Sequence, residues 1–105
     1  MFDEDAKLII VENDKDEDGF PVETTKEIPV YVSKKSAVRS EHYEALRSGI
    51  LVKLVLELRV EDFELSAHRV EGRKEYASRV EYDGGVYNIV RTYGTDKATI
   101  ELICS

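Results

Sequence analysis

The chain has 105 residues, a net charge of −7 and a single cysteine. This length predicts one domain, residues 1–105, and the lone cysteine excludes an intrachain disulfide bond. The acidic balance excludes attraction to DNA, RNA or anionic lipid through the overall electrostatic field. The acidic N-terminus and the short apolar runs predict neither a signal peptide nor a membrane span.

The N-terminal part of the chain is expected to contain a short strand followed by an acidic loop. Residues 1–6 form an acidic lead that we expect to be frayed. Residues 7–12 are rich in branched apolar side chains, which predicts a strand covered on both faces. Residues 13–26 predict an acidic loop with a turn near its start.

This loop carries four carboxylates close together, Asp14, Asp16, Glu17 and Asp18. Its three aspartates alternate and Gly19 follows them, as at the start of an EF-hand calcium loop. That loop also needs a glutamate six positions after the glycine, where this chain has Thr25, and it needs flanking helices. We therefore interpret the stretch as a solvated hairpin tip, predict no metal ion, and keep a small metal- or ligand-binding barrel as the alternative function.

A second strand and a helix are expected next. Residues 27–34 alternate, with Ile28, Val30 and Val32 on one face. Pro29 lacks an N–H group, which predicts an edge position or pairing that begins after it. Residues 36–49 place apolar side chains at helical spacing, so we expect a helix of about three turns that packs across one opening of the sheet.

The clearest periodicity covers residues 50–61, where every even position is apolar. A period of two predicts a strand with Leu54, Leu56 and Leu58 on its buried face. Twelve extended residues would span about 40 Å, whereas a domain of this length has a radius of gyration of about 13 Å. The strand must therefore twist and bend, which favours a small antiparallel β-barrel with long loops over a flat sheet.

Residues 62–75 have mixed polarity and predict a loop. This loop contains the only basic cluster of the chain, Arg69, Arg73 and Lys74. A solvated loop is one interpretation. Long loops in compact domains are also often functional, which makes the cluster a candidate partner contact.

The C-terminal part predicts a meander of strands. Residues 76–93 form a hairpin centred on Asp83–Gly84, because a type I′ turn needs positive φ at both central residues. This register places Val80 opposite Tyr87 and gives one face four apolar or aromatic side chains, Val80, Tyr82, Tyr87 and Ile89. Residues 98–104 predict the last strand, in which apolar positions alternate against Glu101.

The sequence predicts no catalytic motif and no cofactor. His42 and His68 lie 26 positions apart, and no cysteine stands near either of them, so a zinc site is not expected. Cys104 lies in strand alternation and is expected in the core. Tyrosines can stack on single-stranded nucleic acid, but no basic groove accompanies them here. We therefore assign three of them to the barrel wall, Tyr82, Tyr87 and Tyr93.

From residue 30 to residue 104, the order of these features resembles that of phage head closure proteins, also called head–tail adaptors or stoppers. Relatives typically begin their helix with Ser-Glu-aromatic-Tyr, which Glu41 and Tyr43 match. Relatives commonly carry Tyr-x-Gly-x-x-Tyr-x-Ile and an arginine in the later hairpin. The matching residues are Tyr82, Gly84, Tyr87, Ile89 and Arg91. His42 departs from the usual phenylalanine, and the loop over residues 64–75 is longer than usual.

The resemblance implies a small antiparallel β-barrel with one helix and a structural, non-enzymatic role. Copies would form a ring, twelvefold in the virion and monomeric when free, below the portal or its adaptor. The ring would close the channel after DNA packaging and dock the tail or the tail terminator. DNA would pass without sequence-specific binding, no membrane or cofactor would take part, and assembly would occur in the bacterial cytoplasm before the subunit resides in the virion.

An acidic channel lining suits this role, because basic side chains would bind phosphates at every subunit. The four carboxylates of the acidic loop are therefore the candidate channel or partner loop.

Overall fold

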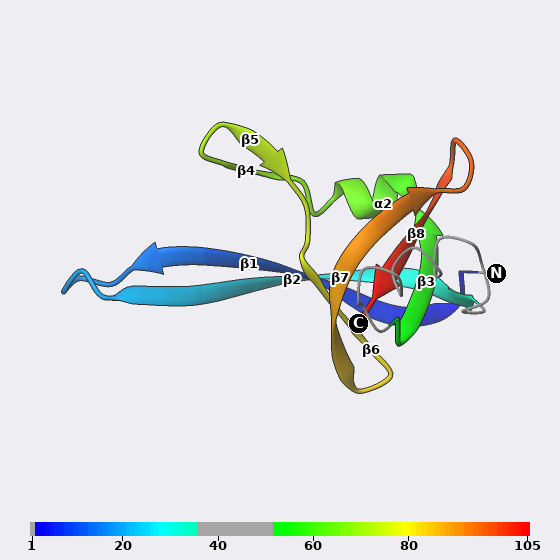
Figure 1. Cartoon of the computed structure of the whole chain (residues 1–105), viewed down its shortest axis with the longest axis horizontal. Helices are drawn as coiled ribbons and strands as arrows, with labels where there is room; N and C mark the ends of the chain where they lie inside the picture. Colours follow the sequence, from blue (N-terminus) through cyan, green and yellow to red (C-terminus); the bar gives the residue numbers. More distant parts are fainter. Residues whose placement is uncertain (1, 36–51) are drawn as a thin grey trace.

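Six antiparallel strands close into a ring in the computed structural model, which describes residues 2–35 and 52–105. Around the ring the order is β1 (Glu4–Lys15), β2 (Pro21–Lys35), β3 (Leu54–Arg59), β8 (Thr99–Cys104), β7 (Gly85–Gly94) and β6 (Arg79–Tyr82). The predicted fold class, a mainly β antiparallel barrel-like sheet, is confirmed (Figure 1). The helix expected over residues 36–49 and the motif residues Glu41, His42 and Tyr43 lie outside the described residues.

The interior of the ring is filled with apolar side chains. Leu54, Leu56 and Leu58 of β3 are all buried, as their alternation predicted. They pack with side chains from the other strands of the ring, among them Leu8, Val32, Val80, Leu102 and Cys104. The prediction that Cys104 lies in the core is confirmed, since its side chain is fully buried.

The strand predicted over residues 50–61 ends earlier than expected. β3 stops at Arg59, and a short helix, α2 (Val60–Glu64), follows directly. Glu61 and Asp62 lie in its first turn, where carboxylates interact favourably with the helix dipole. Phe63 is buried in the core cluster, so the helix brings its aromatic side chain against the end of the ring. None of the described helices is long and apolar enough to cross a membrane.

The predicted β6–β7 hairpin is confirmed in register and turn. Val80 lies opposite Tyr87, and the turn residues Asp83 and Gly84 have φ values of +50° and +80°. Val80 and Tyr82 are buried, and Tyr87 and Ile89 pack against the core from partly buried positions. Positive φ at both central residues matches the strong right-handed twist of a two-residue hairpin.

Strands β1 and β2 are much longer than the sequence predicted. Their antiparallel pairing runs from Glu4 opposite Val32 to Lys15 opposite Pro21. The prediction that residues 1–6 are frayed is therefore wrong from Glu4 onward, where β1 begins, and Ala6 is buried. The acidic loop expected over residues 13–26 is also wrong in extent, because only residues 16–20 connect the two strands.

The distal half of this hairpin projects from the ring as a two-stranded ribbon, which we call the arm, residues 11–27 (Figure 1). It gives the molecule a length of 48 Å against about 30 Å in the other directions. No side chain of the arm is buried. Pro29 lies where β2 has only β1 beside it, since pairing with β3 begins at Ser33; its predicted edge position is confirmed.

The prediction of a loop over residues 62–75 is also wrong. After α2 the chain forms a small separate hairpin, β4 (His68–Val70) and β5 (Arg73–Glu75). Its turn residues Glu71 and Gly72 both have positive φ, as a tight hairpin turn requires. We call this element the β4–β5 hairpin; it projects from the ring beside the root of the arm (Figure 1).

Two assignments of side chains to faces need correction. Glu101 was expected to be on a wet face, but its side chain is fully buried, as are Val55 and Ile103. The alternation itself is right, because the core-facing set contains Leu102 and Cys104. Tyr93 was assigned to the barrel wall, yet it is 47% exposed. The outer face of β3 and β8 is thus more buried than the alternating pattern predicted. The end of β7 is more exposed than predicted.

Candidate functional site

The four predicted carboxylates lie at the tip of the arm. Asp14 is the next-to-last residue of β1, and Asp16, Glu17 and Asp18 form the turn with Gly19 at φ +82°. Asp16 organises this turn, since its Oδ1 atom accepts hydrogen bonds from the N–H groups of Asp18 at 3.0 Å and Phe20 at 2.9 Å. The tip is therefore a defined Asx-type turn rather than an irregular loop.

The arm carries most of the net negative charge of the protein. Residues 11–27 contain seven acidic and two basic residues, a net charge of −5 out of −7 for the whole chain. In the described residues, no three or more His, Cys, Asp or Glu side chains converge where they could hold a metal ion. Glu12, Glu23 and Glu27 form exposed ion pairs with Lys26, Arg79 and Lys7. The carboxylates at the tip have no basic partner among the ion pairs of the described residues, and the excess of acidic groups makes the arm an acidic surface.

The arm also presents apolar side chains that sequence reasoning overlooked. Phe20 is 65% exposed at the tip, and Val22 is 37% exposed beside it. Phe20 and Val22 together form a small apolar surface on a ribbon that is otherwise acidic. The signal in the sequence was an aromatic residue directly after a polar turn, at a position where no core face was predicted.

The predicted basic cluster lies on the β4–β5 hairpin, and its members do not share a face. Arg69 pairs with Lys74 on one face, whereas Arg73 shares the opposite face with His68 and Glu75. Arg69 donates a 3.1 Å hydrogen bond to the carbonyl of Gly72 and so reinforces the turn. The hairpin and the tip of the arm lie at separate places in the molecule (Figure 1).

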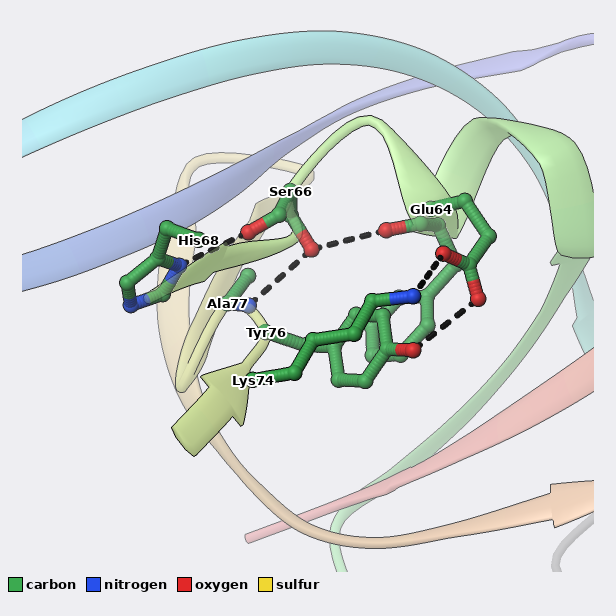
Figure 2. A network of polar contacts seen from close by, with 7 residues as sticks. Glu64, Ser66, His68, Lys74, Tyr76 and Ala77 are labelled. Atoms are coloured by element: carbon green, nitrogen blue, oxygen red, sulfur yellow. Dashed lines mark hydrogen bonds and ion pairs between the residues drawn. The ribbon is translucent and has the colours of Figure 1, made fainter. Parts of the chain in front are cut away.

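Lys74 is held by a polar network at the root of the hairpin (Figure 2). Its Nζ atom donates to Oε2 of Glu64 at 3.0 Å, and the hydroxyl of Tyr76 donates to Oε1 of the same carboxylate at 3.0 Å. The hydrogen bond from Lys74 is the main cause that lowers the pKa of Glu64, and the same bond raises the pKa of Lys74. The pair joins α2 to β5.

Buried contacts beneath this pair fix the position of the hairpin. The rings of Phe63 and Tyr76 stack with centroids 5.0 Å apart. The hydroxyl of Ser66 donates to the carbonyl of Phe63 at 2.8 Å and accepts from the N–H of Ala77 at 3.0 Å (Figure 2). A ring nitrogen of His68 lies 2.8 Å from the carbonyl oxygen of Ser66. The side chains of Ser66 and His68 bond to backbone groups, and together with the ring stack they hold the hairpin on α2.

Between this hairpin, α2 and β7 lies an open groove of about 700 Å³. Its apolar lining comes from several elements: Val11, Phe63, Tyr76, Ile89, Val90 and Ile100. Titratable side chains also line it, namely Glu64, His68, Glu75 and Arg91. We refer to this feature as the groove.

The groove lies where β6 no longer pairs with its neighbours in the ring. β6 covers β7 only as far as Asn88, and it covers β1 only as far as Ile9. From Val90 onward β7 pairs with β8 alone among the described elements, so its other edge borders the groove. An unpaired strand edge beside an apolar floor is the geometry in which proteins accept an added strand.

The later motif residues form one structural unit. Tyr82, Tyr87 and Ile89 pack the β6–β7 hairpin against the core, Gly84 lies in its turn, and Arg91 lines the groove. The ring of Tyr87 lies 3.1 Å from the site of a Cβ atom at Gly85, so a side chain there would force the ring to shift.

No protein-family model, curated protein or solved structure matches the chain.

Proposed function

We propose that this protein is a structural subunit of a phage or prophage head–tail connector, in which copies form a ring that closes the DNA channel and docks the tail. The observation that carries the proposal is the arm, an exposed acidic ribbon on a ring of strands whose interior is filled with apolar side chains. In the described part of the molecule, the arm and the β4–β5 hairpin both project from the ring (Figure 1).

The charge of the arm supports a passage for DNA. Phosphate groups bind surfaces that present Lys and Arg, and each such contact strengthens binding. An arm with a net charge of −5 repels phosphate instead. Copies arranged around one axis would repeat that charge, so DNA could move through the ring without being retained by its wall.

The rigid attachment of the hairpin supports a role in protein contacts. The Ser66 hydrogen bonds and the Phe63–Tyr76 stack fix the hairpin on α2. The hairpin therefore presents Arg69 and Arg73 from a fixed position, as docking to a portal, adaptor or tail protein requires. No step of this proposed role needs a cofactor.

Deletion of the gene tests the proposal directly. Without this subunit, we expect particles that package DNA, lose it again, and fail to join tails. Electron microscopy of the lysate and nuclease sensitivity of the packaged DNA measure both effects. Supplying the intact chain from a plasmid should restore tailed particles. Normal yields of tailed, nuclease-resistant particles from the deletion strain would contradict the proposal, as would absence of the protein from purified virions.

A further inference from the structure

We propose that the arm of one subunit docks in the groove of the neighbouring subunit, with Phe20 in contact with the apolar floor beside the open edge of β7. This inference rests on the proposed function, since it supplies the contact that would link copies into a ring. It names the second copy of this chain as the occupant of the groove.

Shape and polarity match between the two surfaces. The arm is a narrow ribbon whose tip exposes Phe20 and Val22, and the groove offers apolar lining side chains that include Ile89 and Val90. Burying an exposed phenylalanine removes apolar surface from water, which favours the contact. In addition, the outer edge of β2 is open from Pro21 to Val32 among the described elements, as is the edge of β7 beside the groove.

Charge argues for the groove and against a second arm as the occupant. Two arms of −5 each would repel, which disfavours pairing of arm with arm. The lining of the groove is close to neutral by comparison: Arg91 and Glu75 carry opposite charges, and Lys74 pairs with the other lining carboxylate, Glu64. An acidic arm therefore meets far less repulsion at the groove than at a second arm.

Topology requires that the arm come from another copy. The arm leaves the ring at Val11, which itself lines the groove, and its tip lies at the far end of the molecule (Figure 1). The arm therefore cannot fold back into its own groove as a straight ribbon. A contact between different surfaces of successive copies is a heterologous interface, and such interfaces generate closed rings when the rotation closes.

Disulfide trapping between two single-site variants tests this contact. Val22→Cys places a thiol on the arm beside Phe20 and keeps the aromatic side chain, and Val90→Cys places one at the groove; both positions are exposed, so folding should be unaffected. The native Cys104 is fully buried and provides no competing thiol. The matched control is Val86→Cys, on the same strand but away from the groove lining, with 59% exposure.

The two variants are mixed at 0.1 mM each under a mild oxidant. A docked pair has an effective concentration in the millimolar range, so Val22→Cys should link to Val90→Cys about tenfold faster than to Val86→Cys. Equal rates for both partners would overturn the inference, and so would a product dominated by Val22→Cys homodimers.

This experiment and the gene deletion fail independently. Fast linkage to Val90→Cys together with normal particles from the deletion strain would leave the contact standing and refute the connector role. Defective particles together with no preferential linkage would leave the connector role standing and refute the docking of the arm.

Discussion

The hydroxyl of Tyr82 donates a 2.6 Å hydrogen bond to Oε1 of Glu4, a residue 78 positions earlier in the chain. This bond ties the start of β1 to the end of β6, where Ala6 lies opposite Tyr82. The hydrogen bond to the Glu4 carboxylate, assisted by burial, raises the pKa of Tyr82 to about 12. The N-terminal residues are thus part of the ring closure.

Replacing Tyr82 by phenylalanine should lower the free energy of unfolding by about 1–2 kcal/mol, because a hydrogen bond to a charged partner is lost while the buried ring remains. Urea unfolding at pH 7 measures the change. The matched control is Tyr93→Phe, at an exposed position where about 0.5 kcal/mol or less is expected. Equal effects of the two substitutions would show that the Glu4 contact contributes nothing to stability.

Stability should decline at alkaline pH because of the buried thiol of Cys104. Burial raises the pKa of this group from 9.0 to about 12. Below pH 9 the thiol is protonated in both states and contributes no pH dependence. Between pH 9 and pH 12 the unfolded chain loses the proton and the folded chain keeps it, so the free energy of unfolding falls as pH rises.

For a single group with these pKa values, the free energy of unfolding should be about 1.4 kcal/mol lower at pH 10 than at pH 8. Urea unfolding at both pH values measures the difference. The Cys104→Ala variant will be less stable overall, but its pH dependence over this interval should be reduced by that amount. The same slope in both proteins would mean that Cys104 is accessible to water in the native state.

The alternation of β3 yields a third prediction. Leu56 is fully buried in the core cluster, so Leu56→Ala should lower the free energy of unfolding by about 2–5 kcal/mol. Val86→Ala, at an exposed position of β7, serves as control and should change it by about 0.5 kcal/mol or less. Thermal and urea unfolding of the three proteins provide the comparison; a small effect at Leu56 would place the core elsewhere.

The parts of the fold that the sequence predicted are those where a buried face imposes a pattern. Leu54, Leu56 and Leu58 alternate because one side of β3 faces the core, and Asp83–Gly84 fixes the register of its hairpin. The distal half of β2, residues 21–27, has no buried side chain and so no hydrophobic period to detect. The β4–β5 hairpin was missed for the same reason.

Errors at the candidate sites have a related origin. The aspartates were correctly placed at a hairpin tip because turn residues act locally through hydrogen bonds such as those of Asp16. The exposure of Phe20, the burial of Glu101 and the position of the groove depend on which elements meet in space. A single sequence carries no local signal for such contacts, and only the assembled ring specifies them.

Calcium provides a direct check on the tip of the arm. A site saturated at 100 times its dissociation constant would add about 2.7 kcal/mol to the free energy of unfolding. The carboxylate of Asp16 is already engaged with the turn, and we expect no change in the melting temperature at millimolar calcium. A clear increase, abolished by chelator, would instead favour the metal-binding interpretation of the sequence.

Removing charge from the tip should leave folding unchanged but alter the proposed role of the tip in DNA passage. In the triple variant Asp14→Asn, Asp16→Asn, Asp18→Asn, each side chain keeps an oxygen acceptor, so the turn hydrogen bonds of Asp16 can form as before. We therefore expect an unchanged thermal unfolding midpoint, while the net charge of the chain changes from −7 to −4.

In particles assembled with this triple variant, DNA retention or ejection should be altered, since the acidic surface that repels phosphate is weakened. Nuclease sensitivity and ejection assays on purified particles measure the effect. Lys15→Gln and Lys26→Gln change charge on the same arm in the opposite sense and form the matched control. If particles with the triple variant are unaltered, the tip carboxylates play no part in DNA passage. If the variant shows no thermal unfolding transition, these carboxylates are needed for folding instead.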